Sequence, residues 1–450
     1  MPDRRAPDTV RRWVAPFGEA AGARGPAAAA GCAILGWAAS GGMALTGEPG
    51  GSPLVSPAGL WPLVTDVAAW IEELATFIGS GVHVDPATAL FGRAALGGLT
   101  RCGLVSAGGS TRLLGCQDGW CAVTLSREQD LASVPAILAD AEPGEPWVAL
   151  AAAASARRKT ELVERVQLFG VPSAALPDRV LSGRLPWQLD RIAARLPGRQ
   201  LTGAVVVDLS SLWAGPLCAR ILADAGARVI KVESTRRPDG ARFGNPAFFD
   251  WLHARQESVA VDFTTAVGRE QLAALLAAAD VVIEASRPRA LRQLGVGLDQ
   301  VAHRPGRVWV SITGYGRGAA EERVAFGDDA AVAGGLVGRT AAGPVFCADA
   351  VADPLSGMCA ALGVLSSMAT GGGHLIDVAM RDVAAAFASA PADDYGGHDA
   401  LKVGQDWIVR CPHGEERAVM PPPTPVPCGR AAACGADTKQ VLASVARGYR

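Results

Sequence analysis

The stretch that decides the fold is "GAVVVDLSSLWAGPLCARILADAGARVIKVES", residues 203–234. Its valine-rich start at 203–210 predicts a buried strand, and the apolar run at 214–227 predicts a helix that stops near Gly226. The run "RVIKVES" at 228–234 predicts a second strand. A strand, a helix and a strand in this order form a βαβ unit, whose two strands lie parallel.

The alternation continues toward the C-terminus. The predicted strands are 258–263, 280–286 and 307–316, the predicted amphipathic helix is 268–279 with Leu272, Leu275 and Leu276 on its apolar face, and a helix-rich stretch includes 354–369 and 375–390. We therefore predict an α/β fold, with a doubly wound, parallel, Rossmann-like sheet domain and a smaller α+β domain. Ligands are expected at the carboxyl ends of the strands.

The turn after the first strand lacks the chemistry of a dinucleotide site. It reads "SSLWAGP" instead of G-x-G-x-x-G, so the backbone cannot approach a pyrophosphate closely. Glu233 ends the next strand, where a ribose-binding acid would stand. The sequence also contains neither a P-loop nor the G-x-S-x-G turn of serine hydrolases.

Composition excludes further classes. A net charge of -2 predicts no nucleic-acid-binding field, so any anionic ligand must be met by a local basic cluster. The ten cysteines show no C-x-x-C spacing and predict no metal site, and scattered thiols suit a reducing cytoplasm. The uncharged run between Arg24 and Glu48 is long enough to span a bilayer, but its Ala/Gly-rich sequence favours a buried helix.

We expect three regions: residues 1–200, 201–395 and 396–450. The first contains predicted helices at 66–78, 86–98, 128–140 and 148–168, and a hairpin at 110–126 that turns at Asp118-Gly119. The second is the sheet domain, and the third is expected to pack back on the others. Residues 37–54 also echo residues 330–346, which indicates either a degenerate partial repeat or chance similarity in an Ala/Gly-rich chain.

Two acids, Asp349 and Asp353, stand in the apolar segment "GPVFCADAVADPLSG". Asp353 precedes Pro354 and is therefore an expected helix N-cap, which would explain it without any function. The same position suits catalysis, because a helix N-terminus favours an ionised carboxylate. Asp349 would act in the opposite direction through like-charge repulsion.

Seven short sequence motifs occur within about 250 residues, in the order in which one known protein family has them. They are "VVVDLSSLWAGPLCARILADAGARVIKVES", "SVAVDF", "AADVVIEASRPRALRQLG", "SITGYG", "ADPLSG", "GGGHLIDVAMRD" and "GADTKQVLA". Together they resemble the class III CoA-transferases, which include formyl-CoA and carnitine CoA-transferases and the related alpha-methylacyl-CoA racemases.

The resemblance implies an acyl-CoA:carboxylate CoA-transferase in which Asp353 is the nucleophile. Its carboxylate would form a mixed anhydride and then an aspartyl-CoA thioester, with no metal or redox cofactor and with acyl-CoA and a carboxylic acid as substrates. The family position for CoA matches Trp213, Ala214, Gly215 and Pro216. A cytoplasmic homodimer that contacts neither nucleic acid nor membrane is expected.

Several departures leave alternatives open. The small-domain hairpin and "GVPSAAL" precede the catalytic half, so the order is permuted or derives from a fused duplicate whose first copy decayed. The basic residues that usually contact CoA are altered, and Arg255, Arg236 and Arg287 are candidates to meet its phosphates.

The racemase branch of the family has a Gly-His-Asp before the catalytic aspartate, where this chain has Asp328 and Asp329. An exposed aspartate is a poor base near neutral pH, so these two acids are expected either to support the transfer site, to cap a helix or to stay solvated. An acyl-CoA racemase or epimerase, and a non-catalytic CoA-binding or scaffold protein, remain the alternative functions.

Overall fold

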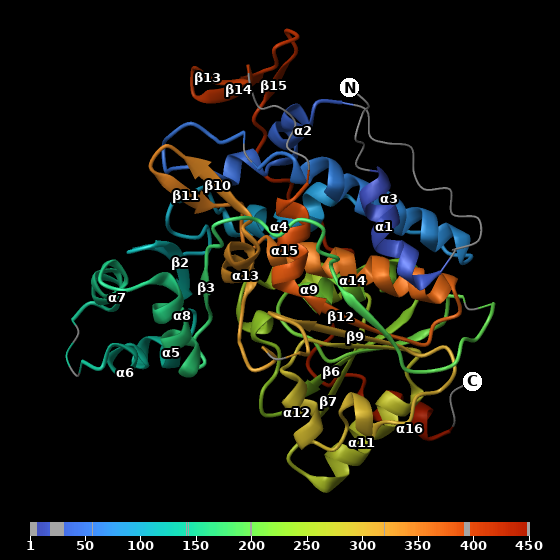
Figure 1. Ribbon diagram of the computed structural model, residues 1–450. Coiled ribbons are helices and arrows are strands. Elements are labelled where there is room, and N and C mark those ends of the chain that lie inside the picture. The colour runs from blue at the N-terminus through green and yellow to red at the C-terminus, as the bar shows by residue number, and fades with distance from the viewer. Residues whose placement is uncertain are drawn as a thin grey trace.

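The computed structural model describes residues 7–18, 31–55, 57–140, 142, 144–198, 200–318, 320–390 and 397–447. Its centre is a seven-stranded sheet in the order β4-β12-β9-β8-β5-β6-β7 (Figure 1). The strands are β4 (Gln188–Arg191), β5 (Val205–Asp208), β6 (Arg228–Ser234), β7 (Glu257–Val261), β8 (Val281–Glu284), β9 (Val308–Thr313) and β12 (His374–Ala379). All pair in parallel except β4, which pairs antiparallel with β12 at the edge. The predicted doubly wound sheet is confirmed.

Helices cover both faces of this sheet. In Figure 1, α9 (Ala214–Asp224) and α14 (Ala352–Ala369) lie above it, and α11 (Ala266–Ala278), α12 (Pro288–Gln293) and α16 (Thr438–Ala446) lie below it. Successive strand residues point to opposite faces, so Val206 joins the core under α9, while Val205 and Val207 join the core that contains Leu272. The remaining helices around the sheet are α10 (Pro246–His253), α13 (Gly327–Gly334), α15 (Met380–Ala388) and the 3-10 turns η3 (Gly240–Phe243) and η4 (Leu298–Gln300).

The secondary structure of residues 375–390 was predicted wrongly in part. The stretch 375–390 reads as helical, but its first part is the strand β12 and only its second part is the helix α15. All six residues of β12 are buried between β9 and β4. A short run that is buried on both faces has no alternation, so its periodicity does not distinguish a strand from a buried helix.

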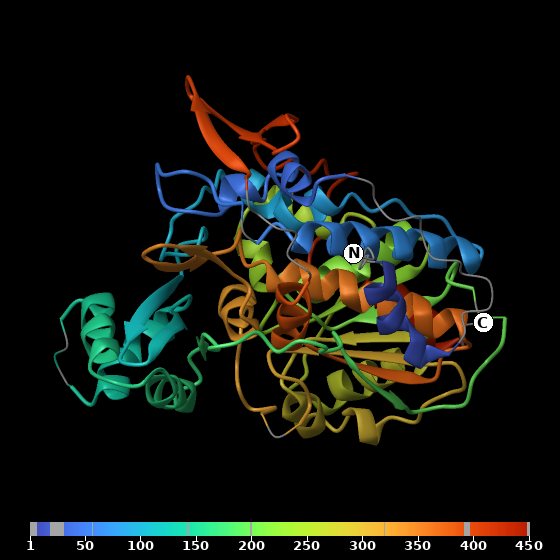
Figure 2. The same ribbon diagram turned by 45° about the horizontal axis from the view of Figure 1, so that its top comes forward.

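A small lobe precedes the sheet in sequence and lies beside it (Figures 1 and 2). Its antiparallel sheet contains β1 (Thr111–Cys116), β2 (Gly119–Thr124) and β3 (Ser173–Ala175), with α5 (Glu128–Ala132), α6 (Val134–Leu138), α7 (Pro146–Ser155) and α8 (Lys159–Leu168) around it. The predicted hairpin is confirmed, with Cys116 opposite Gly119 across the turn. The predicted helix at 148–168 is two helices, because the chain turns between Ala156 and Arg158.

The partial repeat remains a prediction, although its two segments share one structural feature. The helix α2 (Ala33–Ser40) ends at Gly41 in the left-handed conformation, as α13 ends at Gly335. Each is followed by a turn and then by an 18-residue helix, α3 (Leu60–Phe77) or α14. The helices α3 and α14 pack against each other. The other elements of these regions are η2 (Met43–Leu45), α4 (Pro86–Gly97), β10 (Val337–Thr340) and β11 (Gly343–Phe346), and α1 (Pro7–Val14) and η1 (Ala15–Phe17) precede them.

The C-terminal region returns to the body of the protein. A three-stranded sheet of β13 (Asp399–Val403), β14 (Asp406–Arg410) and β15 (Glu416–Ala418) projects beside α2 (Figure 2). The chain then reaches the edge strand β7, where Asp437 accepts from the Ser258 N–H at 2.8 Å. Within the described residues, no helix is long and apolar enough to cross a membrane. The boundary near residue 200 remains a prediction. The strand β4 comes before this boundary in sequence, but it pairs with β12 and so belongs to the central sheet.

Candidate active site

The strand order reverses between β5 and β8, and the turn into α9 lies at this point of the sheet. Leu212 has a left-handed φ of 70°, and the buried Trp213 follows it directly. Gly215 and Gly357 allow close packing at this turn. An added Cβ on Gly215 would lie 2.1 Å from Ser210 Oγ, and one on Gly357 would lie 2.5 Å from the Ala214 carbonyl oxygen of α9. The close contact of α9 with α14 brings the predicted CoA-binding turn near the predicted nucleophile.

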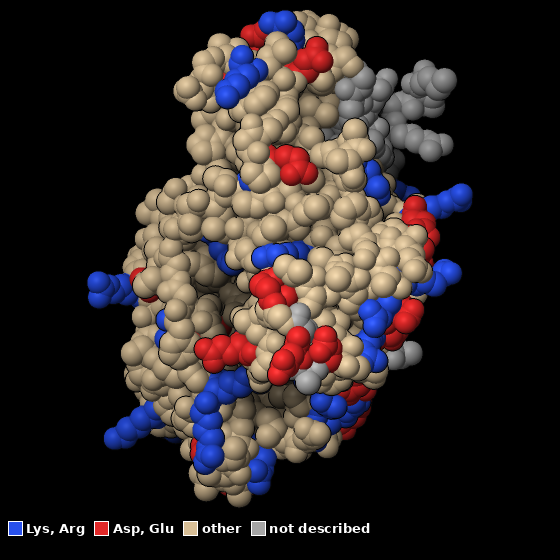
Figure 3. Space-filling view, turned by 90° about the vertical axis from the view of Figure 1, so that its left-hand side faces the viewer, with Lys and Arg blue, Asp and Glu red and all other residues tan. Residues whose placement is uncertain are grey.

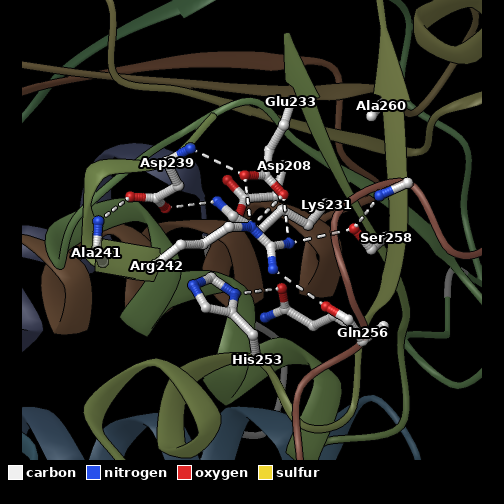
Figure 4. Close-up of polar contacts among 12 residues, drawn as sticks. Asp208, Lys231, Glu233, Asp239, Ala241, Arg242, His253, Gln256, Ser258 and Ala260 are labelled. Atoms are coloured by element: carbon white, nitrogen blue, oxygen red, sulfur yellow. Dashed lines mark hydrogen bonds and ion pairs between the residues drawn. The ribbon is translucent and has the colours of Figure 1, made fainter. Parts of the chain in front are cut away.

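A buried ionic network fixes the same turn (Figure 4). The Lys231 ammonium lies 3.0 Å from Asp239 Oδ2 and donates to the Ser210 carbonyl oxygen at 2.8 Å. Asp239 Oδ1 in turn accepts from the Leu212 N–H at 3.0 Å. Glu233 forms an ion pair with Arg242 at 2.6 Å, so its carboxylate is occupied and does not stand free for a ribose. These charged residues therefore hold the α9 turn in place.

The loop before α14 carries backbone strain. Ala348 and Ala350 have φ values of 54° and 43°, a left-handed conformation that costs about 1–2 kcal/mol for a residue with a Cβ. Two side chains hold the loop: the Ala348 N–H donates to Thr46 Oγ1 at 3.1 Å, and the Ala350 N–H donates to Asp328 Oδ1 at 2.9 Å. Such strain is typical of functional sites.

The strained loop directs Asp349 into an ion pair. Both of its carboxylate oxygens lie 2.7 Å from Arg93 Nη1, and its side chain is fully buried. Burial raises the pKa of Asp349, and the Arg93 charge acts in the opposite direction. The Arg93 guanidinium also lies 5.7 Å from the centre of the Trp213 ring. Asp349 is therefore a structural acid whose oxygens are both engaged.

Asp353 is placed differently. The helix begins at Ala352, and Val351 occupies the N-cap position, so the expectation that Asp353 is the N-cap is wrong. Its side chain stays partly exposed, and an added Cβ on Gly327 would lie 2.6 Å from its Oδ2. Burial raises the pKa of Asp353 to about 7, while Arg93 lowers it and the charges of Asp328 and Asp349 raise it.

Of the alternatives for the two acids at the start of α13, full solvation is wrong, because Asp329 is buried and Asp328 is only partly exposed. Asp329 is fully buried, accepts from the Phe326 N–H at 2.9 Å and caps its helix, and burial raises its pKa to about 8. Asp328 stays partly exposed and accepts from Thr111 Oγ1 of the small lobe at 3.2 Å. Burial and the Asp349 charge raise the pKa of Asp328 to about 6.

The predicted phosphate contacts are all exposed arginines. Arg236 lies 3.2 Å from Asp262, Arg255 lies 3.3 Å from Asp224, and Arg287 lies 4.0 Å from Glu322. Arg236 and Arg287 follow β6 and β8, at the carboxyl edge of the sheet. Their role in binding CoA remains a prediction.

Sequence reasoning missed three arginines near the site. Arg93 comes from α4, 256 residues before its partner Asp349, and no local motif marks it. Arg323 and Arg381 both lie over the Tyr315 ring and line a cavity of about 460 Å³ near the carboxyl ends of β9 and β12. On the face shown in Figure 3, basic and acidic side chains are interspersed, so positive charge is local, as the composition predicts.

Comparison with known proteins identifies a family for the second half of the chain. Residues 201–428, about half of the chain, match the family described as CoA-transferase family III. Succinyl-CoA–D-citramalate CoA-transferase of Chloroflexus aurantiacus is 27% identical over 47% of this chain and 58% of its own length. Formyl-CoA:oxalate CoA-transferase of Rhodopseudomonas palustris is 28% identical over 41% of this chain and 47% of its own length.

A solved structure is also similar. It is a CAIB/BAIF family protein from Brucella suis, with 28% identity and a TM-score of 0.43 over 48% of this chain and 66% of that chain. The chain thus spans about half the length of the curated relatives given above. On the family match over residues 201–428, the chain belongs to CoA-transferase family III.

Proposed function

We propose that this protein is an acyl-CoA:carboxylate CoA-transferase and that Asp353 is its nucleophile. The observation that carries the proposal is the contrast between two neighbouring acids. Asp349 has both oxygens on Arg93 and is fully buried, whereas Asp353 remains partly exposed beside the α9 turn. A nucleophile needs a free lone pair and access for the substrate, and only Asp353 of this pair offers both.

The proposed chemistry proceeds by carboxylate exchange. An Asp353 oxygen adds to the thioester carbonyl carbon, the carbon–sulfur bond breaks, and the CoA thiolate leaves with the electron pair. The thiolate then adds to the aspartyl carbonyl of the mixed anhydride and releases the first carboxylate. The acceptor carboxylate adds to the aspartyl-CoA carbonyl carbon, and the carbon–sulfur bond breaks to give a second mixed anhydride and the CoA thiolate. The thiolate finally adds to the acyl carbon of the acceptor in this anhydride. The bond from that carbon to the Asp353 oxygen breaks, which forms the new acyl-CoA and frees the Asp353 carboxylate. Dividing one exchange into such steps is the advantage of a covalent nucleophile.

The surrounding residues have supporting roles in this proposal. Burial makes the Asp353 carboxylate a stronger base and nucleophile than a solvated one, at the cost of a smaller ionised fraction near neutral pH. Arg93 supplies positive charge that offsets the three acids around it. Asp328 holds the strained loop through the Ala350 N–H. The steps use no metal or redox cofactor.

An acyl-CoA racemase is the second candidate, and the environment of Asp328 favours it. Exchange of a proton alpha to a thioester requires a base with a pKa near neutrality, and burial raises the pKa of Asp328 to about 6. Asp328 and Asp353 are both partly exposed, so two acids near neutrality face the same region.

Trapping separates the candidates. We would incubate the protein with succinyl-CoA or formyl-CoA, the donors for which two of the relatives are named, and a panel of carboxylates, then add hydroxylamine and map the modified peptide by mass spectrometry. The transferase proposal requires a hydroxamate on Asp353 that depends on acyl-CoA, and loss of transfer by at least about 1,000-fold in Asp353→Asn. Asp66→Asn is the control, because Asp66 lies on α3 and its carboxyl is also buried.

Two other outcomes would overturn the proposal. Deuterium exchange at the alpha carbon without any trapped adduct would identify a racemase. CoA binding without either reaction would identify a binding or scaffold protein. A homodimer and a cytoplasmic location also remain predictions, which gel filtration with light scattering and cell fractionation would test.

A further inference from the structure

Three potential metal ligands from opposite ends of the chain meet outside the active site. The sulfur atoms of Cys32 and Cys411 and a ring nitrogen of His398 all lie within 4.8 Å of one another. Cys32 directly precedes α2, His398 precedes β13 and Cys411 follows β14. Figure 1 shows α2 beneath the projecting sheet that contains β13 and β14.

The separations suit a tetrahedral zinc ion. Zn–S bonds of about 2.3 Å and Zn–N bonds of about 2.0–2.1 Å place tetrahedral sulfur and nitrogen ligands about 3.6 Å apart. Cys32 Sγ lies 3.2 Å from His398 Nε2, so the two atoms need to separate by only a few tenths of an ångström to admit the ion. A pair of thiolates with one imidazole is a ligand set that Zn²⁺ favours.

The backbone around Cys32 suits a thiolate ligand. The Cys32 sulfur lies at the start of α2, where the N–H groups of Ile34 and Leu35 point to it. A dication would remove the repulsion between the two sulfurs. Among the described residues, the buried His398 Nδ1 has no hydrogen-bond partner, so the contact with Cys32 is what orients the imidazole ring.

The turn at Cys411 is rigid. The Gly414 N–H donates to the Cys411 carbonyl oxygen at 2.9 Å, and the Cys411 N–H donates to the Glu415 carbonyl oxygen at 2.8 Å. These bonds fix the backbone on which the sulfur stands. Only 5% of Cys411 is exposed, while Cys32 and His398 are partly exposed, so one side of the cluster is open to water.

We propose that Cys32, His398 and Cys411 bind one Zn²⁺ ion, with water in the fourth position. This site ties the C-terminal sheet to α2 and takes no part in the chemical steps of CoA transfer. The sequence gives no sign of it, because Cys32 and His398 are 366 residues apart. A bond between such distant segments closes a long loop, which stabilises the folded chain.

The site also secures a segment that leads toward the active site. After β15, the Met420 N–H donates to the Ala38 carbonyl oxygen of α2 at 2.9 Å. Pro425 then packs on Gly92, where an added Cβ would meet its ring at 3.0 Å. Gly92 adjoins Arg93, the partner of Asp349. Release of the metal would therefore loosen the segment that covers the helix carrying Arg93.

The test is metal analysis of the full chain. We would purify it under reducing conditions and measure its zinc content by inductively coupled plasma mass spectrometry. The affinity for Zn²⁺ would be determined by competition with a chromogenic chelator. The wild type is expected to hold about one Zn²⁺ per chain. Cys32→Ser, Cys411→Ser and His398→Ala are each expected to weaken binding at least about 100-fold, since loss of an outer partner alone costs 10–100-fold.

Matched controls lie close by. His413→Ala removes an exposed imidazole two residues from Cys411, and Cys434→Ser removes an exposed thiol, and both should retain the metal. Substitution with Co²⁺ should give a thiolate-to-cobalt absorption band that the ligand variants lack, which reports the site even in a destabilised variant. Absence of metal from the wild type, a Cys32–Cys411 disulfide in non-reducing peptide maps, or equal zinc in wild type and ligand variants would each overturn the proposal.

Discussion

Replacing Asp328 by Asn removes one negative charge from the acid cluster and keeps its shape. The Asn side-chain oxygen can still accept from the Ala350 N–H, which donates to Asp328 Oδ1 at 2.9 Å. The charge of Asp328 is one of the causes that raise the pKa of Asp353 to about 7, after burial. The substitution should therefore lower the pKa of Asp353 and increase its ionised fraction below neutral pH.

The size of the effect follows from Coulomb's law. Two carboxylates about 6 Å apart repel by about 1.4 kcal/mol at an effective dielectric of about 40, which suits partly exposed groups. That energy moves a titration midpoint by about one pH unit. Asp328 itself is about half protonated at pH 6, because its pKa is about 6, so the gain there is reduced. We expect transfer to be about three- to fivefold faster at pH 6 and nearly unchanged at pH 8.

The assay is the pH dependence of kcat/KM from pH 5 to pH 9 with succinyl-CoA as donor. Asp66→Asn is the matched control, because burial alone raises the pKa of Asp66 to about 6 and no charge of the cluster contributes. Its profile should coincide with that of the wild type. An unmoved midpoint in Asp328→Asn, or one displaced toward alkaline pH, would refute the reasoning.

Three further predictions concern stability. Arg93→Met leaves the fully buried Asp349 without its partner and should lower the free energy of unfolding in urea by about 3 kcal/mol. Adding Asp349→Asn should restore most of this loss. An unchanged free energy of unfolding in Arg93→Met alone would contradict the ion-pair argument. Ala350→Gly relieves the strain of a φ of 43° and should raise the free energy of unfolding by about 0.5–1 kcal/mol. The control Ala352→Gly, within α14, should lower it by about as much. A lower free energy of unfolding in Ala350→Gly would show that the loop is not strained. Burial lowers the pKa of His253 to about 3, so between pH 7.5 and pH 5 the unfolded chain binds a proton that the folded chain does not. The free energy of unfolding should therefore fall by about 2 kcal/mol over this pH range in the wild type. In His253→Asn the fall should be smaller by that amount, and an equal fall in both proteins would contradict the prediction.

Local pattern was sufficient for most of the central sheet. Each of two local patterns predicted one element correctly. They are the valine run of β5 and the apolar face of α11 with Leu272, Leu275 and Leu276, and the structure buries these residues as the patterns indicate. The strand β12 was predicted as part of a helix, because it is buried on both faces. Its sequence therefore shows neither the two-residue period of a strand nor the 3.6-residue period of a helix. The error therefore came from burial, which depends on neighbours that the local sequence does not contain.

The site depends on partners that lie far away in sequence. Asp349 and Asp353 are four residues apart in one small, apolar segment, and residue chemistry alone could not rank them. What separates them is Arg93, which a helix of the N-terminal region brings to both oxygens of Asp349. The strained φ values of Ala348 and Ala350 turn Asp349 toward that arginine, and they leave Asp353 in the first turn of α14. The arginine and the strain thus act together: Asp349 forms a structural ion pair, and this pair fixes the backbone that carries the proposed nucleophile. The first 200 residues are for this reason part of the proposed catalytic site, although the family match begins only at residue 201.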